Sequence, residues 1–373
     1  MARPKNFRYA LNQKIRRIAK TVMRWVTNES KEKRLDFQCE EIERILLVRA
    51  TSRMGDSILA TGAIPAFRKS FPDARIDFVG SRISSALLRN LPIDNHFTIT
   101  RRFPHASWSY LVLLAQLRSI RYDFAIDLSC SQSAMGSFIV GFSGARFRVG
   151  LRGEWDRWFN VRIDRPPERN KYSVLPALLQ AVGLPAEENL PFLVLSHGEK
   201  EDGRKKINDL IAADRAPVVG VFVGGRKSWG KRWPIDNFCE LIRTLYRRGI
   251  NVITFVGPEE TRLVGFLKKA LGTQPLVYES SSRNFAAMVS HCDLFVTCDS
   301  GPMHLASALG TRTVAIFRNN NFDHWAPPQT LARVVYQPDG CSTAAVLSVC
   351  LAELTGSHPS ESSRSADAPV LTV

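Results

Sequence analysis

The side chains best suited to chemistry lie in the stretch CDSGPMHLASALGTRTVAIF, residues 298–317. Its proline is favoured in the first turn of a helix, so Ser300 and Gly301 leave backbone amides free at a helix start. Free amides at that position attract phosphate groups. Asp299 would repel a phosphate, so we expect it to cap the turn or to accept hydrogen bonds from a sugar hydroxyl. A single histidine is usually structural, but the place of His304 in this stretch favours a hydrogen-bond donor to a phosphate.

A second polar stretch is GGRKSWGKRWP, residues 224–234. Two glycines follow an apolar run, and four cations come before a predicted helix: Arg226, Lys227, Lys231 and Arg232. The stretch matches neither the GxxxxGK[ST] nor the GxGxxG motif. Basic loops are usually only solvated, but cations beside a helix start, directly after a strand, favour an anion site.

The third stretch is TSRMGDS, residues 51–57. Gly55 permits a close approach of the backbone. Asp56 stands just before a helix that we expect to begin near Ser57. A carboxylate there is either a helix N-cap or a general base, and the spacing alone favours the N-cap.

These three stretches are positioned by short apolar strands that alternate with helical segments, which predicts an α/β fold with two doubly wound parallel sheets. In such sheets ligands bind beyond the carboxyl ends of the strands, where all three stretches lie. The predicted strands include residues 44–50, 74–80, 122–129, 216–225, 250–257, 293–298 and 313–317.

The pattern also sets expected boundaries. Residues 150–173 are rich in Arg, Trp and Pro and predict a loop, whereas Pro234 and Gly249 predict the first position and the end of a helix. We expect four parts: a basic amphipathic extension (1–43), an N-terminal domain (44–200), a C-terminal domain (201–356) and a disordered tail (357–373).

Composition narrows the class of protein. A chain of 373 residues favours two domains, and its net charge of +16 is concentrated at the start, where residues 1–35 hold eleven Lys or Arg and two Glu. Apolar residues at helical spacing in that segment predict an amphipathic helix that contacts an anionic inner-membrane surface or packs on the body of the protein. No secretory signal or apolar run of about 18 residues is present, so we expect a cytoplasmic protein, peripheral on the inner membrane if the segment binds it. Nucleic-acid binding is disfavoured, because no aromatic RNA-binding signature accompanies the basic residues.

Three segments together resemble glycosyltransferase family 9, the ADP-heptose:lipopolysaccharide heptosyltransferases. They are ILLVRATSRMGDSILATGAIPAFRKSFPDARIDFVG, KRWPIDNF and DLFVTCDSGPMHLASALGTRTVAIF, and the likeness extends over residues 44–355. The resemblance implies a GT-B fold, in which two Rossmann-like domains face each other across a cleft. It also implies that the N-terminal domain binds the acceptor, that the C-terminal domain binds the nucleotide sugar, and that transfer is inverting and metal-independent.

The resemblance also implies roles for individual residues. Asp56 matches the catalytic base, and Lys231, aided by Arg226 or Lys227, matches the group that stabilises the leaving diphosphate. Either Glu259 or Glu260 is expected near the nucleoside ribose. The remaining assignments are Asp299, Ser300, Gly301 and His304 at the donor site, and Ser52, Gly55 and Arg152 on the acceptor side.

The expected function is transfer of a heptose from ADP-heptose to an anionic glycolipid, the lipopolysaccharide core, without a metal or other cofactor. The chain has no DxD, HExxH or zinc-spaced Cys/His motif. Two alternatives stay open: a family member that uses another nucleotide sugar or glycan acceptor, and a catalytically idle, membrane-associated protein that binds sugar nucleotides. Arg318, in place of a usual glycine, and Asn170–Lys171, in place of a usual histidine, depart from the family pattern and bear on the identity of donor and acceptor.

Overall fold

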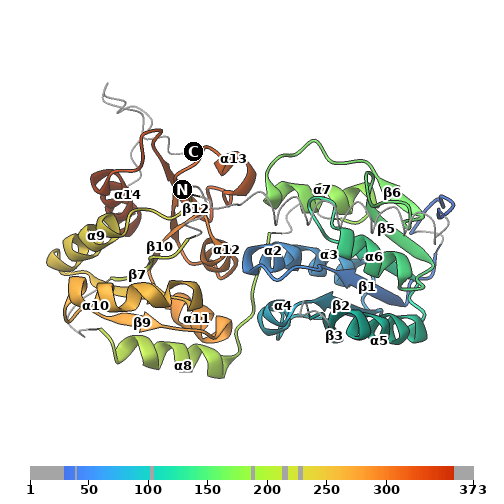
Figure 1. Ribbon diagram of the computed structural model, residues 1–373, viewed down its shortest axis with the longest axis horizontal. Coiled ribbons are helices and arrows are strands. Elements are labelled where there is room, and N and C mark those ends of the chain that lie inside the picture. Colours follow the sequence, from blue (N-terminus) through green and yellow to red (C-terminus); the bar gives the residue numbers. More distant parts are fainter. Residues whose placement is uncertain are drawn as a thin grey trace, which may run out of the picture.

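The computed structural model describes residues 29–37, 40–100, 105–185, 190–211, 217–225 and 230–356. Within these residues the chain forms two α/β units side by side, each built on a six-stranded parallel sheet (Figure 1). The central strands are buried over nearly their whole length, as expected when helices cover both faces of a parallel sheet, whereas the edge strands β3, β6 and β9 are largely half-buried or exposed. The expected fold class is therefore confirmed.

The first sheet has the strand order β3-β2-β1-β4-β5-β6. Val48, at the end of β1, pairs with Val79 of β2 and with Asp127 of β4, so the carboxyl ends of the central strands lie at one edge. The six strands are β1 (Arg44–Val48), β2 (Arg75–Gly80), β3 (Asn95–Thr98), β4 (Phe124–Asp127), β5 (Phe147–Leu151) and β6 (Val161–Ile163).

Helices cover both faces of this sheet. Side chains from one group of helices pack into one core with β1 and β2, and those from a second group pack into a separate core on the other face. The first group comprises α2 (Met54–Leu59), the short 3-10 helix η1 (Ala60–Gly62), α3 (Ala63–Ser70), α4 (Arg82–Leu87) and α7 (Lys171–Ala181), and the second comprises α5 (His105–Ile120) and α6 (Ala134–Phe142).

The second sheet has the order β12-β11-β10-β7-β8-β9 and is covered in the same way. Its strands are β7 (Val218–Phe222), β8 (Asn251–Val256), β9 (Leu276–Tyr278), β10 (Leu294–Cys298), β11 (Thr313–Phe317) and β12 (Ala332–Tyr336). One face of this sheet carries α8 (His197–Asn208), α11 (Ser282–Val289) and α12 (Gly301–Ala308). The other face carries α9 (Ile235–Arg247), α10 (Val264–Leu271) and α14 (Thr343–Thr355). Two short helices, η3 (Pro258–Leu263) and α13 (Phe322–Trp325), follow the ends of β8 and β11.

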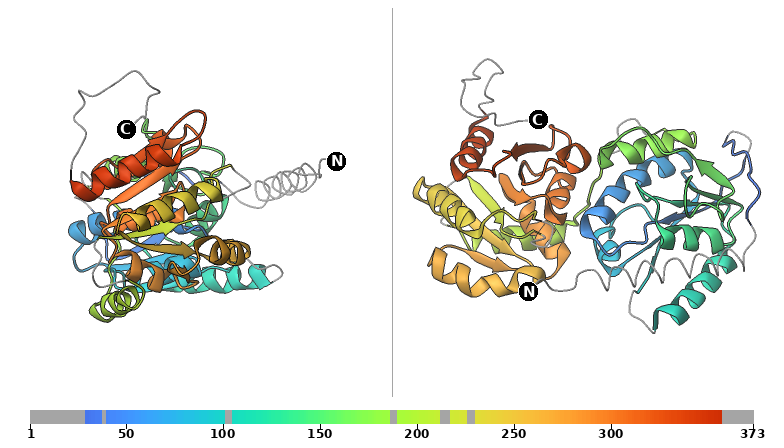
Figure 2. Two further views of the ribbon diagram at one scale, coloured as in Figure 1. Left: turned by 90° about the vertical axis from the view of Figure 1, so that its left-hand side faces the viewer. Right: turned by 45° about the horizontal axis from the view of Figure 1, so that its top comes forward.

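The two units are packed together and not merely tethered. In Figures 1 and 2 the contact runs from α2, α4 and α7 of the first unit to α11, α12 and α13 of the second. Leu305 of α12 and Ala286 of α11 belong to the same buried apolar cluster as Ile58 and Ile64 of the first unit. The predicted domain boundary between residues 200 and 201 falls within α8, which packs on α11.

Two local predictions were wrong. Residues 150–173, expected to be loop, contribute the end of β5 and the edge strand β6, because backbone pairing of Val149 with Val161 stabilises a strand too short to show periodicity. Pro234 is the N-cap of α9 and not its first helical residue, since its ψ of 135° is extended. Cys239 and Leu241 lie on the buried face of α9.

Some predictions fall outside the described residues. They concern Arg226, Lys227, most of the basic extension (residues 1–28) and the tail (357–373). Among the helices that the structure describes, none combines the length and the apolar character that crossing a membrane requires.

Candidate active site

A pocket of about 720 Å³ lies between the two units. Its walls are the segments that follow β1 and β2 in the first unit and β7, β8, β9, β10 and β11 in the second. The pocket therefore joins the carboxyl edges of both sheets, the position where open α/β sheets bind ligands. We call it the interdomain pocket. Among the sequence-predicted residues it is lined by Ser52, Gly55, Asp56, Lys231, Glu259, Glu260, Asp299, Ser300, Gly301 and His304.

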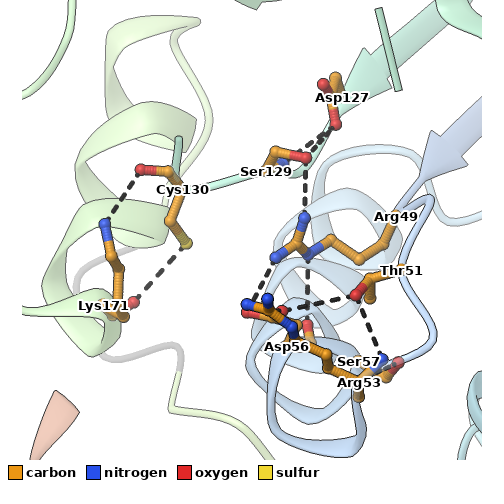
Figure 3. A network of polar contacts seen from close by, with 9 residues as sticks. All are labelled: Arg49, Thr51, Arg53, Asp56, Ser57, Asp127, Ser129, Cys130 and Lys171. Atoms are coloured by element: carbon orange, nitrogen blue, oxygen red, sulfur yellow. Dashed lines mark hydrogen bonds and ion pairs between the residues drawn. The ribbon is translucent and has the colours of Figure 1, made fainter. Parts of the chain in front are cut away.

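Asp56 enters the pocket from the first turn of α2. The helix begins at Met54, and its N-cap is Arg53, whose side chain caps no amide. The N-cap interpretation of Asp56 is therefore wrong: the residue lies inside the helix, with only 13% of its side chain exposed. Its carboxylate points into a network of polar side chains and not to the amides of its own helix (Figure 3).

Arg49, at the end of β1, holds the Asp56 carboxylate. The guanidinium Nη2 lies 3.0 Å from Asp56 Oδ1, and Nη1 donates to Ser129 Oγ at 2.8 Å (Figure 3). Ser129 in turn donates from its hydroxyl and its amide to Asp127 Oδ1. Thr51 completes the setting by donating to Asp56 Oδ2 at 3.4 Å. Four residues at the ends of β1 and β4 thus fix one carboxylate at the pocket wall.

Asp127 is the buried end of this network. Burial raises its pKa to about 6, against the opposing effects of Ser129 and Arg49. The Gly136 Cα lies against the carboxylate, where an added Cβ would be 2.4 Å from Oδ2. The Asp127 carboxyl group is therefore enclosed. It takes part in the network through its hydrogen bonds from Ser129 and through electrostatic attraction to Arg49.

Helices α2 and α12 cross at two glycines, which brings the two predicted motifs together. An added Cβ on Gly55 would lie 2.5 Å from His304 Cδ2, and one on Gly301 would lie 3.0 Å from Met54 Cβ. Only a residue without a side chain allows so close an approach. The contact sets Asp56 and the start of α12 on adjacent walls of the interdomain pocket.

The start of α12 carries the second group of predicted residues. Asp299 does not cap the helix as expected; the N-cap is Ser300, which makes no side-chain capping hydrogen bond. Instead, Asp299 Oδ2 lies 2.5 Å from Lys231 Nζ and accepts a hydrogen bond from Asn321 Nδ2 at 3.2 Å. The Lys231 ammonium also lies 5.7 Å from the ring centre of Trp325, a favourable cation–π distance.

His304 is buried on the same helix, beside α7. Burial lowers its pKa to about 4, so the ring is neutral near pH 7. Its Nδ1 lies 2.7 Å from the hydroxyl of Tyr172, a hydrogen bond between the two units. When the Tyr172 hydroxyl donates this bond, the ring proton resides on Nε2. The expected donor is therefore a neutral imidazole and not a cation.

Glu259 and Glu260, which the sequence could not separate, have different surroundings. Glu260 is buried, accepts a hydrogen bond from the Gly257 amide at 3.3 Å, and has its pKa raised chiefly by burial. Glu259 is exposed and lines the interdomain pocket. Both residues line the pocket, Glu260 as a buried acceptor within the loop after β8 and Glu259 as the more exposed carboxylate.

Arg152 stands apart from the pocket. Its guanidinium pairs with Glu32 and Asp164 on the surface of the first unit, 3.1 Å from each, and it does not line the pocket. Among the residues that the structure describes, no group of three or more His, Cys, Asp or Glu side chains could hold a metal ion.

Sequence reasoning missed several residues at this site: Arg49, Asn321, Trp325 and Tyr172. Arg49 follows a strand directly, which is a usable signal. Asn321 and Trp325 lie more than 20 residues beyond Asp299, and Tyr172 comes from the other unit. No local spacing connects these three with the pocket.

A sequence profile of glycosyltransferase family 9 (heptosyltransferase) matches residues 110–350, more than half of the chain. The chain belongs to this family. As a family 9 glycosyltransferase it falls within the heptosyltransferases of lipopolysaccharide core biosynthesis, which confirms the resemblance seen in the sequence.

Relatives of known function agree. The chain is 28% identical over 310 residues to lipopolysaccharide heptosyltransferase 2 of Escherichia coli strain K12, covering 78% of this chain and 87% of that protein. It is 25% identical over 313 residues to lipooligosaccharide heptosyltransferase 2 of Campylobacter jejuni, with 79% and 89% covered.

Solved structures support the fold. A family 9 glycosyltransferase from Veillonella parvula superposes with a TM-score of 0.76 at 20% identity, over 87% of this chain and all of that one. The E. coli ADP-heptose heptosyltransferase II superposes with a TM-score of 0.69 at 23% identity, over 84% and 99%. This family 9 glycosyltransferase thus has the GT-B arrangement of two Rossmann-like units.

Proposed function

We propose that this glycosyltransferase moves a heptose from ADP-heptose to a lipopolysaccharide core acceptor in a single inverting step without a metal. The observation that carries the proposal is the meeting, in one pocket, of Asp56 from the first unit with Lys231 and the start of α12 from the second. An E. coli heptosyltransferase of the same fold was solved with ADP and with ADP-2-deoxy-2-fluoro heptose, which supports the choice of donor.

The step uses one carboxylate base. Asp56 takes the proton from an acceptor hydroxyl while the hydroxyl oxygen forms a bond to the anomeric carbon. The bond from that carbon to the diphosphate oxygen breaks on the opposite face, and ADP leaves with the electron pair. Arg49 and Thr51 orient the base, so that its proton-accepting oxygen is positioned before the acceptor binds.

The leaving diphosphate gains its stabilisation from the second unit. Lys231 supplies a positive charge, and the amides at the start of α12 supply partial positive charge where negative charge develops. Asp299, held by Lys231 and Asn321, is available to accept hydrogen bonds from sugar hydroxyls, while Glu259 is available to the ribose. Because the proposed stabilisation comes from Lys231 and the helix amides, transfer should continue in the presence of a chelator.

Replacement of the base tests the proposal. We expect Asp56→Asn to lower the rate of ADP release with a truncated lipopolysaccharide acceptor at least about a hundredfold, because general-base catalysis contributes that much. ADP-heptose affinity, measured by calorimetry, should stay within a factor of about three, because Asp56 does not bind the donor diphosphate.

The control is Asp73→Asn, which changes an exposed carboxylate of the same unit and should leave turnover intact. Near-normal turnover of Asp56→Asn would remove the base from the mechanism. A parallel series of nucleotide sugars tests the donor: faster turnover with a different sugar would favour the alternative donor, and binding without turnover would favour the idle binding protein.

A further inference from the structure

Helix α5 exposes an apolar face that the glycosyltransferase site does not explain. Trp108, Leu111 and Val112 lie at helical spacing of three and four and are 73%, 59% and 42% exposed. The other side of the helix, with Leu113 and Leu117, is buried in the core of the first unit. Single exposed apolar residues are common, but three on one helix face, led by a tryptophan, indicate an interaction surface.

The charged residues of α5 and of the chain on either side of it, between Asp94 and Asp123, are all positive. From Asn95 to Tyr122 the sequence has four arginines and neither Asp nor Glu. Arg118, on α5 itself, and Arg121, just beyond it, are exposed. Apolar and aromatic residues flanked by arginines are typical of helices that lie in the interface of an anionic bilayer. A second copy of the chain would bring the same positive charge to the same face, which disfavours self-association there.

Ser30, near the start of the described chain, bonds to a segment that packs on α6, the neighbour of α5. Ser30 donates from its amide to the Arg157 carbonyl and from its hydroxyl to the Trp158 carbonyl. The Trp158 ring packs against Phe142 of α6, and α6 packs on α5. Residues 1–28 contain eight Lys or Arg and no acid, so their charge opposes docking on α5 and suits the same anionic partner.

The exposed residues lie in the first half of α5, near the edge of the sheet that bears the pocket. Because α5 follows β3 and returns to the start of β4, its N-terminal half belongs to the carboxyl edge. Asp56 stands at this same edge, after β1. Figure 2 (left) shows α5, in teal, projecting from the side of the molecule.

We propose that the face formed by Trp108, Leu111, Val112 and Arg118 docks on an anionic lipid bilayer. Docking places the carboxyl edge of the first sheet against the membrane in which a glycolipid acceptor is anchored. The inference rests on the proposed function for the identity of the acceptor, but lipid binding itself does not depend on catalysis.

The test is sedimentation of the full chain with vesicles of phosphatidylethanolamine and phosphatidylglycerol, with phosphatidylcholine vesicles as the uncharged reference. We expect the variant Trp108→Ser/Leu111→Ser/Val112→Ser to partition into anionic vesicles about tenfold less than the parent, because it loses the apolar area that inserts. Phe266→Ser removes an apolar residue of similar exposure from α10 of the other unit and should partition as the parent does. Phosphatidylcholine should bind all forms weakly.

A charge variant, Arg118→Gln/Arg121→Gln, keeps the apolar residues. It should also bind anionic vesicles more weakly than the parent, and its binding should depend less on salt concentration than that of the parent. Melting temperatures equal to that of the parent show that the variants are folded. Equal or stronger partition of the serine variant would overturn the proposal and would mean that residues 1–28 or another copy covers this face. Dissociation of an oligomer by the serine substitutions, without a change in lipid binding, would also overturn it.

Turnover separates this proposal from the proposed function. We expect the serine variant to transfer normally to a lipid-free acceptor fragment and poorly to an acceptor embedded in vesicles. Loss of transfer to both acceptors at unchanged lipid binding would overturn the docking face. Absence of transfer in the parent with every donor would refute the proposed function and leave the sedimentation result standing.

Discussion

Glu259 and Glu260 are neighbours in the chain, yet the fold gives them opposite surroundings. Glu260 is buried and accepts hydrogen bonds from the backbone of its loop, whereas Glu259 is exposed at the interdomain pocket. We expect Glu259→Gln to raise the apparent dissociation constant of the donor about tenfold with no change in melting temperature. Glu260→Ala should lower the free energy of unfolding by about 1–3 kcal/mol, because it leaves buried amides without acceptors.

Donor titration and thermal melting of both variants measure this contrast. The reverse result, a donor defect confined to the Glu260 variant, would exchange the two roles. Each variant serves as the control for the other, because the two positions share one loop and differ only in burial.

Arg49 acts through Asp56. The guanidinium touches the carboxylate and Ser129 but does not line the interdomain pocket, so we regard it as a positioning residue. We expect Arg49→Met to lower kcat about tenfold or more with little change in the donor KM, because a displaced base is a catalytic and not a binding defect. Arg49→Lys should restore part of the rate by keeping the charge.

The measurement is steady-state kinetics with the lipopolysaccharide acceptor. Arg44→Met is the matched control, because Arg44 lies at the opposite end of β1. The Arg44 side chain donates a hydrogen bond to the backbone carbonyl of Ile120. A purely structural role for Arg49 would lower stability and leave the kcat of the folded fraction unchanged, which would contradict this assignment.

At the scale of elements, the crossing of α2 and α12 makes the site. The approach depends on Gly55, where a methyl group would lie 2.5 Å from the His304 ring. We expect Gly55→Ala to push the two helices apart and to lower kcat about tenfold or more, because the base and the donor site then separate. The two units should each stay folded, since the atoms nearest the added methyl group belong to His304 at the contact between the units.

The control for this element is Gly265→Ala. Gly265 lies in α10 with no heavy atom within 4 Å of an added Cβ, so the change should leave turnover unaltered and raise stability by up to about 1 kcal/mol. Kinetics and thermal melting measure both variants. Normal turnover of Gly55→Ala would show that the close crossing is not needed for transfer.

For the whole molecule, a buried arginine on α11 joins the two units. Arg283 donates from Nε to Glu199 Oε1 at 2.7 Å, and also bonds to the carbonyls of Leu87 in the first unit and Val194 in the connecting segment. Glu199 accepts a further bond from Asn90 of the first unit. The ion pair itself joins α8 and α11 of the second unit, and its hydrogen bonds to Leu87 and Asn90 tie it to the first unit.

The pair predicts a pH dependence of stability. Arg283 first, and hydrogen bonds from Ser196 after it, lower the Glu199 pKa from 4.5 to about 2, so between these values the unfolded chain binds more protons than the folded one. The contribution, up to about 3 kcal/mol, is present above pH 4.5 and is lost as the pH falls toward 2. We expect Arg283→Met to remove most of it at pH 7 and to flatten the dependence below pH 4.5.

Urea unfolding at a series of pH values measures this contribution. Arg204→Met is the control, because Arg204 pairs with Glu201 on the exposed side of α8 and should contribute less than about 0.5 kcal/mol. An unchanged acid dependence in Arg283→Met would mean that Glu199 is stabilised by its capping of α8 and not by the contact between units.

The elements were largely predictable from the chain. The apolar runs at β1, β7 and β11 are long enough and sufficiently β-branched to predict buried strands, and their order predicts two doubly wound sheets. The exceptions have local reasons. The edge strand β6 depends on pairing with β5, and the helix that contains Asp56 begins two residues before that carboxylate, which excludes the cap that its residue type suggested.

The sequence by itself determined the fold class and the candidate residues in each loop, because hydrophobic periodicity and the residues after a strand are local properties. Only the tertiary structure decided how those residues are used. The different burial of Glu259 and Glu260, the pairing of Asp299 with Lys231 and Asn321, and the support of Asp56 by Arg49 depend on contacts between segments far apart in the chain. Free energies of desolvation and pairing are set by the surroundings of a group, and no spacing along the chain specifies those surroundings.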